Sequence, residues 1–368
     1  SKNNELVKLA RAQALSRIGH RQAAERLLTE VDSTQRYREQ VLWQRFQNKM
    51  TEELYADAYH YLGQLRGSSY YAEAQNMYAK LRQGGLETSY STTANYKGNS
   101  LSSYAMAGDV YLGGNTWVTA GVANARLSDK INTATVNSSS VGLVHRFARG
   151  SIGGTIINAV AGGAHTLYNV TGQYKVNDLT TVQATVGKRY IGFAKAVLHD
   201  FITEDYYTLA LTNRFNQRNS WGIEYTGSSL TDGNRFYGYG LQYNYLAVKD
   251  PKKTHEFFGY YRRSGFNKTS DYYESPDKRL AWGGGWQAHW YADNSAYWQV
   301  RVNLEFGHDN QEPTDLSPSV RVKYMYPLGR KQELGVAAEY GVRTDRLNGS
   351  NSFRHGYKQL ELMYSLNW

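Results

Sequence analysis

The sequence predicts an α+β membrane protein. A short α-helical segment occupies residues 1–84, and an antiparallel transmembrane β-barrel of about sixteen strands occupies residues 85–368. Hydrophobic residues recur with a helical period before Gly84 and Gly85 and with a period of two after them. The connections between the predicted strands alternate between short and long, as in outer-membrane barrels. The chain also holds 32 Tyr and 8 Trp against 11 Phe, and such amphipathic rings suit the aromatic belts at the two membrane boundaries.

Residues 4–83 read as helices that fold back on one another. Leu9 and Ile18 lie on one apolar stripe, Gly19 breaks it, and Leu27 begins a second stripe. Three further helical stretches are expected at 37–46, 52–65 and 71–81. Small residues such as Ala56 and Ala72 let paired helices approach closely. This pattern resembles tetratricopeptide repeats, which pair antiparallel helices with small residues at their contacts. The alternative is a short helical bundle that caps the barrel.

The last strand shows the barrel pattern most clearly. Leu360, Leu362, Tyr364, Leu366 and Trp368 alternate with polar residues, which predicts one face toward lipid and one toward a water-filled lumen. The same alternation recurs at 298–306 and 334–342. Between 116 and 163 it is blurred by Ala, Gly, Ser and Thr, and the parity that faces lipid there stays open. The closing Tyr364, Leu366 and Trp368 also resemble the carboxy-terminal assembly signal of bacterial outer-membrane proteins.

The connections predict which side each end of the barrel faces. Short turns built from Gly, Asn, Asp and charged residues are expected on the periplasmic side, for example at 113–115, 177–179, 216–219 and 249–253. Longer external loops are expected at 192–204, 265–278, 308–316 and 345–355. This alternation predicts that both termini, and therefore the N-terminal helices, lie in the periplasm of a bacterial cell.

Composition narrows the classes of function. Cysteine is absent, so neither disulfides nor thiolate metal sites can form. The net charge of +10 is spread over both parts of the chain and argues against nucleic acid as a partner. Mean hydropathy is −0.63, with no apolar run of the length of a spanning helix. The histidines are scattered, without a nucleophile elbow or a zinc-binding helix motif. We expect no enzyme, no cofactor and no metal. No signal peptide opens the sequence, so we expect a mature form or a fragment of a longer protein.

A barrel of about sixteen strands is wide enough for an aqueous channel. The polar parity predicts these lumen residues: Arg189, Arg214, Glu224, Gln242, Gln287, His289, Gln299, Arg301, Glu305, Arg321, Lys323, Glu333, Glu339, Arg343 and Glu361. The alternative reading is structural, since inward side chains of any large barrel are polar and opposed charges pair across strands. Collectively they suit a hydroxyl-rich polymer and select neither charge strongly. Glycines at 238, 240, 283 and 285 are expected to widen the passage.

The candidate gate is the external segment Gly265–Lys278. It carries Phe266, Tyr272, Tyr273 and Glu274, which suit a lid packed over a mixed-charge rim, although a solvated loop is the plainer reading. The next candidate is Gly192–Glu204, whose apolar residues Phe193, Val197, Leu198 and Phe201 would also suit the inward loop of a diffusion porin.

Helical repeats that lead into a sixteen-stranded barrel resemble the outer-membrane porins of exopolysaccharide export, the systems for cellulose, poly-N-acetylglucosamine and Pel. The resemblance implies export of a biofilm-forming polysaccharide from periplasm to cell surface. It also implies that the helices bind a periplasmic polysaccharide-modifying enzyme or an assembly lipoprotein, while outer-membrane lipids surround the barrel. A general diffusion porin and a phage-receptor or adhesin barrel with periplasmic repeats remain alternatives.

Overall fold

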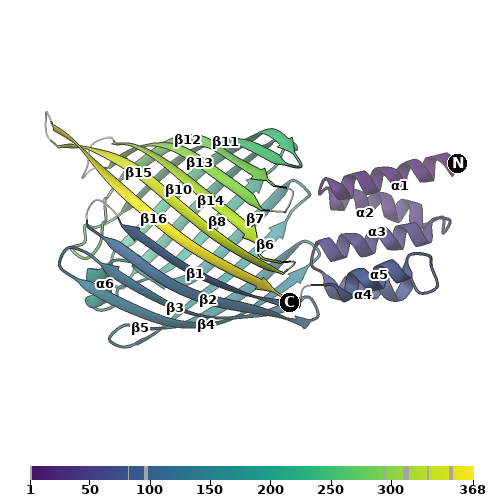
Figure 1. Cartoon of the computed structure of the whole chain (residues 1–368), viewed down its shortest axis with the longest axis horizontal. Coiled ribbons are helices and arrows are strands. Elements are labelled where there is room, and N and C mark those ends of the chain that lie inside the picture. The colour runs from purple at the N-terminus through teal and green to yellow at the C-terminus, as the bar shows by residue number, and fades with distance from the viewer. Residues whose placement is uncertain are drawn as a thin grey trace.

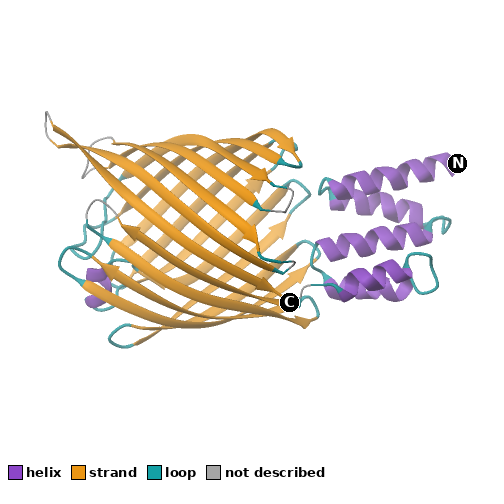
Figure 2. Ribbon diagram, in the orientation of Figure 1, coloured by secondary structure: helices purple, strands orange, loops and turns teal. Residues whose placement is uncertain are grey.

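The computed structural model describes residues 2–81, 83–94, 98–292, 296–309, 315–329, 331–347 and 351–368. Within these residues five helices form an N-terminal unit, and sixteen strands form a closed barrel (Figures 1 and 2). The helical unit lies beyond one end of the barrel, called here the helix-side end, where the C-terminus also lies. The opposite end, called the far end, carries a further short helix, α6 (Ala194–Leu198).

The N-terminal unit stacks its helices in chain order. They are α1 (Lys2–Arg17), α2 (Arg21–Asp32), α3 (Arg38–Thr51), α4 (Tyr55–Gln64) and α5 (Tyr71–Ala79). Gly19 makes the turn between α1 and α2 at a φ of +86°, a left-handed conformation that only glycine adopts without strain. One apolar cluster forms around Leu28 and Val41, and a second around Phe46 and Leu65. In the part of the chain described, no helix is long and apolar enough to span a membrane.

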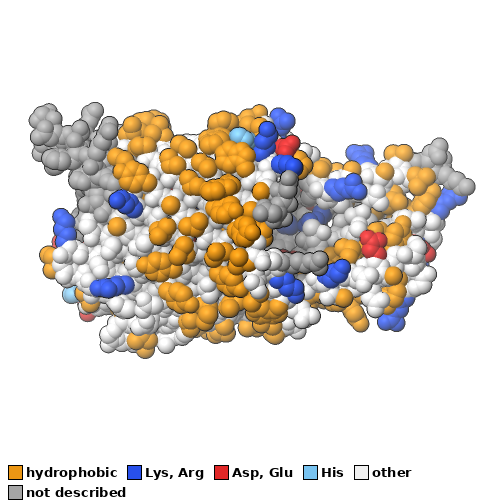
Figure 3. Space-filling model, in the orientation of Figure 1, with side chains coloured by type: hydrophobic (Ala, Val, Ile, Leu, Met, Phe, Trp, Pro, Cys, Tyr) orange, Lys and Arg blue, Asp and Glu red, His pale blue; other side chains and the backbone are white. Residues whose placement is uncertain are grey.

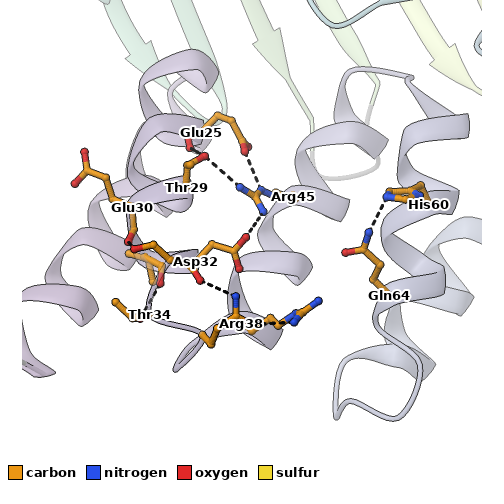
Figure 4. Close-up of polar contacts among 12 residues, drawn as sticks. Glu25, Thr29, Glu30, Asp32, Thr34, Arg38, Arg45, His60 and Gln64 are labelled. Carbon is orange, nitrogen blue, oxygen red and sulfur yellow. Dashed lines mark hydrogen bonds and ion pairs between the residues drawn. The ribbon is translucent and has the colours of Figure 1, made fainter.

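Arg45 on α3 ties that helix to α2. Its Nε donates to Glu25 and its Nη1 to Asp32, both at 2.8 Å, and its Nη2 donates to Thr29 at 3.2 Å (Figure 4). Burial works to lower the pKa of Arg45, but Glu25 and Asp32 outweigh burial and raise that pKa above its ordinary value. The likeness of this helical unit to tetratricopeptide repeats stays a prediction.

The predicted barrel of about sixteen strands is confirmed, and every strand pairs antiparallel with its neighbours. The strands are β1 (Gly84–Ala94), β2 (Ser100–Gly113), β3 (Thr116–Ser128), β4 (Thr133–Phe147), β5 (Gly150–Val160), β6 (Ala164–Lys175), β7 (Thr180–Tyr190), β8 (Thr203–Asn213), β9 (Asn219–Leu230), β10 (Arg235–Asp250), β11 (Lys253–Phe266), β12 (Arg279–Tyr291), β13 (Tyr297–Asp309), β14 (Asp315–Pro327), β15 (Gln332–Leu347) and β16 (Asn351–Asn367). The segment 345–355, expected as a loop, instead largely continues β15 and β16, whose pairing reaches Leu347 and Asn351. Residues 310–314 of the expected loop 308–316 lie outside the described part.

The barrel closes between β1 and β16, and the last residue contributes to the seam. The Trp368 carbonyl oxygen accepts hydrogen bonds from the N–H groups of Gln83 at 2.8 Å and Gly84 at 3.2 Å, and the Trp368 N–H donates to Gly84 at 3.0 Å. A Cβ on Gly84 would lie 2.6 Å from the indole nitrogen of Trp368. Only glycine therefore leaves room for this ring at the seam. Closure removes the open edges that would otherwise need partners in a membrane.

Alternate residues of each strand point out of the barrel and into it. Outward positions carry exposed apolar residues such as Leu362 on β16 and Val336 on β15, and Figure 3 shows hydrophobic side chains gathered over the visible barrel surface. The strand pairing also determines which parity faces outward between residues 116 and 163. Val141 and Ile156 face each other on β4 and β5 and share that outward face.

A turn of the barrel caps α2. Asp178, between β6 and β7, accepts hydrogen bonds from the N–H groups of Gln22 at 2.8 Å and Ala23 at 3.0 Å. N–H groups in the first turn of a helix have no partner inside the helix. The N-cap residue of α2, His20, makes no side-chain cap. The barrel therefore supplies, from 155 residues along the chain, a cap that α2 itself lacks.

A second turn caps α4 in the same way. The side-chain oxygen of Asn115, between β2 and β3, accepts from the Ala56 N–H at 2.8 Å, and its amide nitrogen donates to Asp57 at 2.9 Å. Arg146 at the end of β4 pairs with Glu53 just before α4. These contacts come from the half of the rim formed by β2 to β7, so the helical unit is fixed to that half.

Candidate functional site

The inner wall of the barrel is the candidate site. The register places these predicted residues on the face opposite the exposed apolar residues: Arg189, Glu224, Gln242, Gln287, His289, Gln299, Arg301, Glu305, Arg321, Lys323, Glu333, Glu339 and Glu361. Arg321 on β14 donates to Glu361 on β16 at 2.7 Å although β15 lies between them. Side chains converge in this way only on the concave side, so this face is the lumen.

Two predicted lumen residues, Arg214 and Arg343, are not among these wall residues. Arg214 follows the last residue of β8 and lies in the turn at the helix-side rim, where its N–H donates to the Leu179 carbonyl. It belongs to the entrance and not to the wall, because β8 ends at Asn213, one residue before it. The side chain of Arg343 lies outside the described part of the structure.

The wall from β9 to β16 is charged and internally paired. Arg321 lies between two carboxylates, with its Nη1 3.8 Å from Glu339 in addition to the bond to Glu361. Where the two walls meet at the far end, Arg189 on β7 pairs with Glu204 on β8, and the other oxygen of Glu204 accepts from Ser228 on β9 at 2.8 Å. Opposed charges at this spacing offset one another, so neither sign dominates this wall.

Two aromatic rings of β11 also line the charged wall, although the alternation did not single them out. The hydroxyl of Tyr260 donates to Glu305 at 2.8 Å, and the Arg301 guanidinium lies 4.4 Å from the ring centre of Phe258. A Cβ on Gly283 would lie 2.9 Å from the Tyr260 hydroxyl, and one on Gly285 2.7 Å from the Phe258 ring. The expectation that these two glycines widen the passage is therefore wrong, because their missing side chains make room for the rings.

Aromatics occupy both parities of β11, which is why alternation could not select Phe258 and Tyr260. The run of three glycines opposite them, 283–285, was the available signal. A second hollow does form beside Gly238 and Gly240. Its volume is about 540 Å³, and it is also lined by Arg189, Glu224 and Gln242.

The wall from β1 to β8 carries many small inward residues, and Ser and Thr recur among them as hydrogen-bonded pairs on neighbouring strands. Ser91 and Ser103 hydrogen-bond across β1 and β2 at 2.7 Å. Thr171 and Thr185 do so across β6 and β7 at 3.1 Å. Inward positions between these strands hold residues such as Ala105. The lumen therefore has two unlike sides, a hydroxyl wall and a charged wall.

The segment between β7 and β8 folds into the far end of the barrel. Val197 on α6 and Phe201 pack against inward-facing residues of β3 to β6, among them Leu127, Val136 and Leu167. Phe201 stacks on His165 with ring centres 3.8 Å apart. No sequence pattern pointed to His165, because a contact across the barrel leaves no local signal. The inward packing expected of Val197 and Phe201 is present, whereas Leu198 is exposed.

The candidate gate at 265–278 interlocks with this segment. Tyr272 stacks on His199 with ring centres 4.0 Å apart, and Tyr273 packs in one cluster with Ala196 and Ile202. The Tyr273 hydroxyl donates to Asp232 at 2.8 Å. Burial, together with this bond, raises the pKa of Tyr273 to about 12.

The two candidate gate segments therefore pack against each other as one unit at the far end. Phe266 contacts Tyr273 within it, with ring centres 5.6 Å apart, and Glu274 is exposed. Among the residues described, no group of His, Asp and Glu side chains is placed to hold a metal ion.

Comparison with solved structures gives the fold. A bacterial polysaccharide outer membrane secretin is similar at a TM-score of 0.68 with 13% identity, over 78% of this chain and 99% of that one. OccK11 (OpdR) of Pseudomonas aeruginosa is similar at 0.43 with 13% identity, over 78% of this chain and 95% of that one. An anion-selective porin from Comamonas acidovorans scores 0.40 with 8% identity, over 77% of this chain and 98% of that one. The fold assignment rests on the first of these. No protein-family model and no curated protein matches the sequence.

Proposed function

We propose that this protein is an outer-membrane channel that exports a secreted exopolysaccharide from the periplasm to the cell surface. The observation that carries the proposal is the two-sided lumen, in which a hydroxyl wall faces a wall of paired charges. A hydroxyl-rich chain can exchange hydrogen bonds with both sides as it moves. Balanced charge neither traps nor repels such a chain. The fold similarity to a polysaccharide outer membrane secretin supports this choice of cargo.

The helical unit gives the passage a direction. In our proposal it lies in the periplasm, and the far end opens to the cell surface. The two helix caps and the Arg146–Glu53 pair fix the helices to the rim below the hydroxyl wall. A polymer guided along the helices would therefore reach that wall first. The outer surface of the helices remains available for a periplasmic polysaccharide-modifying enzyme or an assembly lipoprotein.

Narrowing the hydroxyl wall tests the proposal. Ala105 faces inward on β2, whereas Ala120 on β3 pairs with Gly108 and faces outward. Ala105→Trp should lower the polymer recovered outside the cells, and Ala120→Trp should not, while both proteins reach the outer membrane as heat-modifiable barrels. Equal export by the two variants would count against passage along this wall.

A general diffusion porin is the second candidate. It is favoured by the inward-folded segment at Val197 and Phe201, which resembles a constriction loop. Liposome swelling with small sugars separates the two candidates. An exporter with a closed far end should admit glucose slowly in its resting state, whereas a diffusion porin should admit it freely.

A further inference from the structure

The outward face of β3, β4 and β5 holds a polar patch. It consists of Asn124, Asn137, Ser139 and Asn158, called here the amide patch. Asn124 pairs with Asn137 in the register, and Ser139 pairs with Asn158. All four side chains are exposed. They lie on the same face as Val141, where an apolar surface toward lipid is expected.

The amide patch lies in a hollow of about 380 Å³ whose other lining residues include Tyr104, Val122 and Val160. The Asn124 amide nitrogen donates to the Asn137 oxygen at 2.7 Å. An asparagine side chain has two donor hydrogens and an oxygen with two lone pairs. The pair therefore keeps donors and acceptors for a ligand, next to an apolar lining.

The height of the amide patch on the barrel indicates which part of the membrane it contacts. Asn124 follows the first residue of β3, Thr116, by eight positions. At about 3.3 Å per residue and a tilt of about 40°, eight residues rise roughly 20 Å, within an apolar band about 25 Å tall. The patch thus lies near the far-end boundary of the band, with Arg126 two residues beyond it on the same face. In Figure 3 the hydrophobic side chains become sparse toward this end.

Polar side chains that face acyl chains are costly unless they are hydrogen-bonded. We propose that the amide patch binds the sugar and phosphate headgroup of an outer-leaflet glycolipid. The amides exchange hydrogen bonds with its hydroxyl and phosphate oxygens, and Arg126 pairs with a phosphate. Val122, two residues nearer the helix-side end than Asn124, contacts the start of its acyl chains. The proposal rests on the proposed outer-membrane location and orientation, and does not require polymer export.

Native mass spectrometry of the full chain tests this binding. The protein is released from nanodiscs that contain diphosphoryl lipid A as the glycolipid probe and phosphatidylglycerol as an anionic lipid without an amino-sugar headgroup. The double variant Asn124→Leu, Asn137→Leu should retain about thirtyfold less lipid A, as expected for the loss of two hydrogen bonds of average strength. Retention of phosphatidylglycerol should not change.

Ser229→Val is the matched control, because Ser229 is an exposed outward residue near the far end of β9, and it should retain lipid A normally. Asn158→Leu serves as a second variant if the double variant does not assemble. Unchanged lipid A retention would overturn the proposal, as would an equal loss of phosphatidylglycerol. A wild-type dimer that the double variant loses would also overturn it and would assign the patch to a second copy of the chain.

Discussion

Replacing Asp178 with alanine should release the start of α2 from the barrel rim. The carboxylate accepts the two hydrogen bonds from Gln22 and Ala23, and its charge lies at the positive end of the helix dipole. Loss of an N-cap costs about 0.5–2 kcal/mol, and loss of the charge adds about 0.3–1 kcal/mol. We expect a net effect of about 1–2 kcal/mol, which multiplies the open population of this helix start roughly 5- to 30-fold.

Hydrogen exchange of the membrane-embedded chain measures this change directly. Amides at the start of α2 should exchange faster by that factor in Asp178→Ala, while peptides from α3 keep the wild-type rate. Asp178→Asn retains a hydrogen-bond acceptor, so its exchange rate at the start of α2 should lie between those of the wild type and Asp178→Ala. Glu30→Ala is the charge-matched control, because Glu30 lies on α2 and its exposed pair with Lys8 on α1 contributes little.

Two outcomes would refute the reasoning. Unchanged exchange at Gln22 and Ala23 would mean that the carboxylate does not hold the helix. Faster exchange spread evenly over β6 and β7 would mean that the substitution disrupts the turn and not the cap.

Phe201→Ala should open the far end, because loss of a buried aromatic ring costs about 3–5 kcal/mol; single-channel conductance in planar bilayers should rise, and an unchanged value would place the closure elsewhere. Gly84→Ala should lower the yield of heat-modifiable barrel, since its Cβ would lie 2.6 Å from the Asp109 carbonyl oxygen. Gly172→Ala, with nothing within 4 Å of its Cβ, should assemble normally, and equal yields would contradict the steric argument. The pKa of Tyr273, about 12, lies above its ordinary value of about 10. The stability that Tyr273 gives to the packed segments at the far end is therefore complete below pH about 10 and is lost as the pH rises through about 12. Wild-type conductance should increase over that range more steeply than that of Tyr273→Phe. Parallel conductance curves for the two proteins would show that deprotonation of Tyr273 does not cause the increase.

The sequence by itself determined the barrel and most of its inner face. Side chains alternate with a period of two whatever the neighbouring strand is, so the inward positions of Arg301 and Glu361 could be assigned from their own strands. The same argument placed the short turns between strands. Where Ala, Gly and Ser fill both parities, as around Gly142 on β4, alternation carries no information, and only the pairing with β3 and β5 fixed the direction.

Only the tertiary structure decided how distant segments meet. The stacking of Phe201 on His165, and of Tyr272 on His199, joins loops and strands across the barrel mouth. The caps that Asp178 and Asn115 provide depend on where the helical unit rests on the rim. None of these contacts leaves a periodic trace in the sequence. Each depends on the curvature and closure of all sixteen strands, which bring together residues that no local pattern relates.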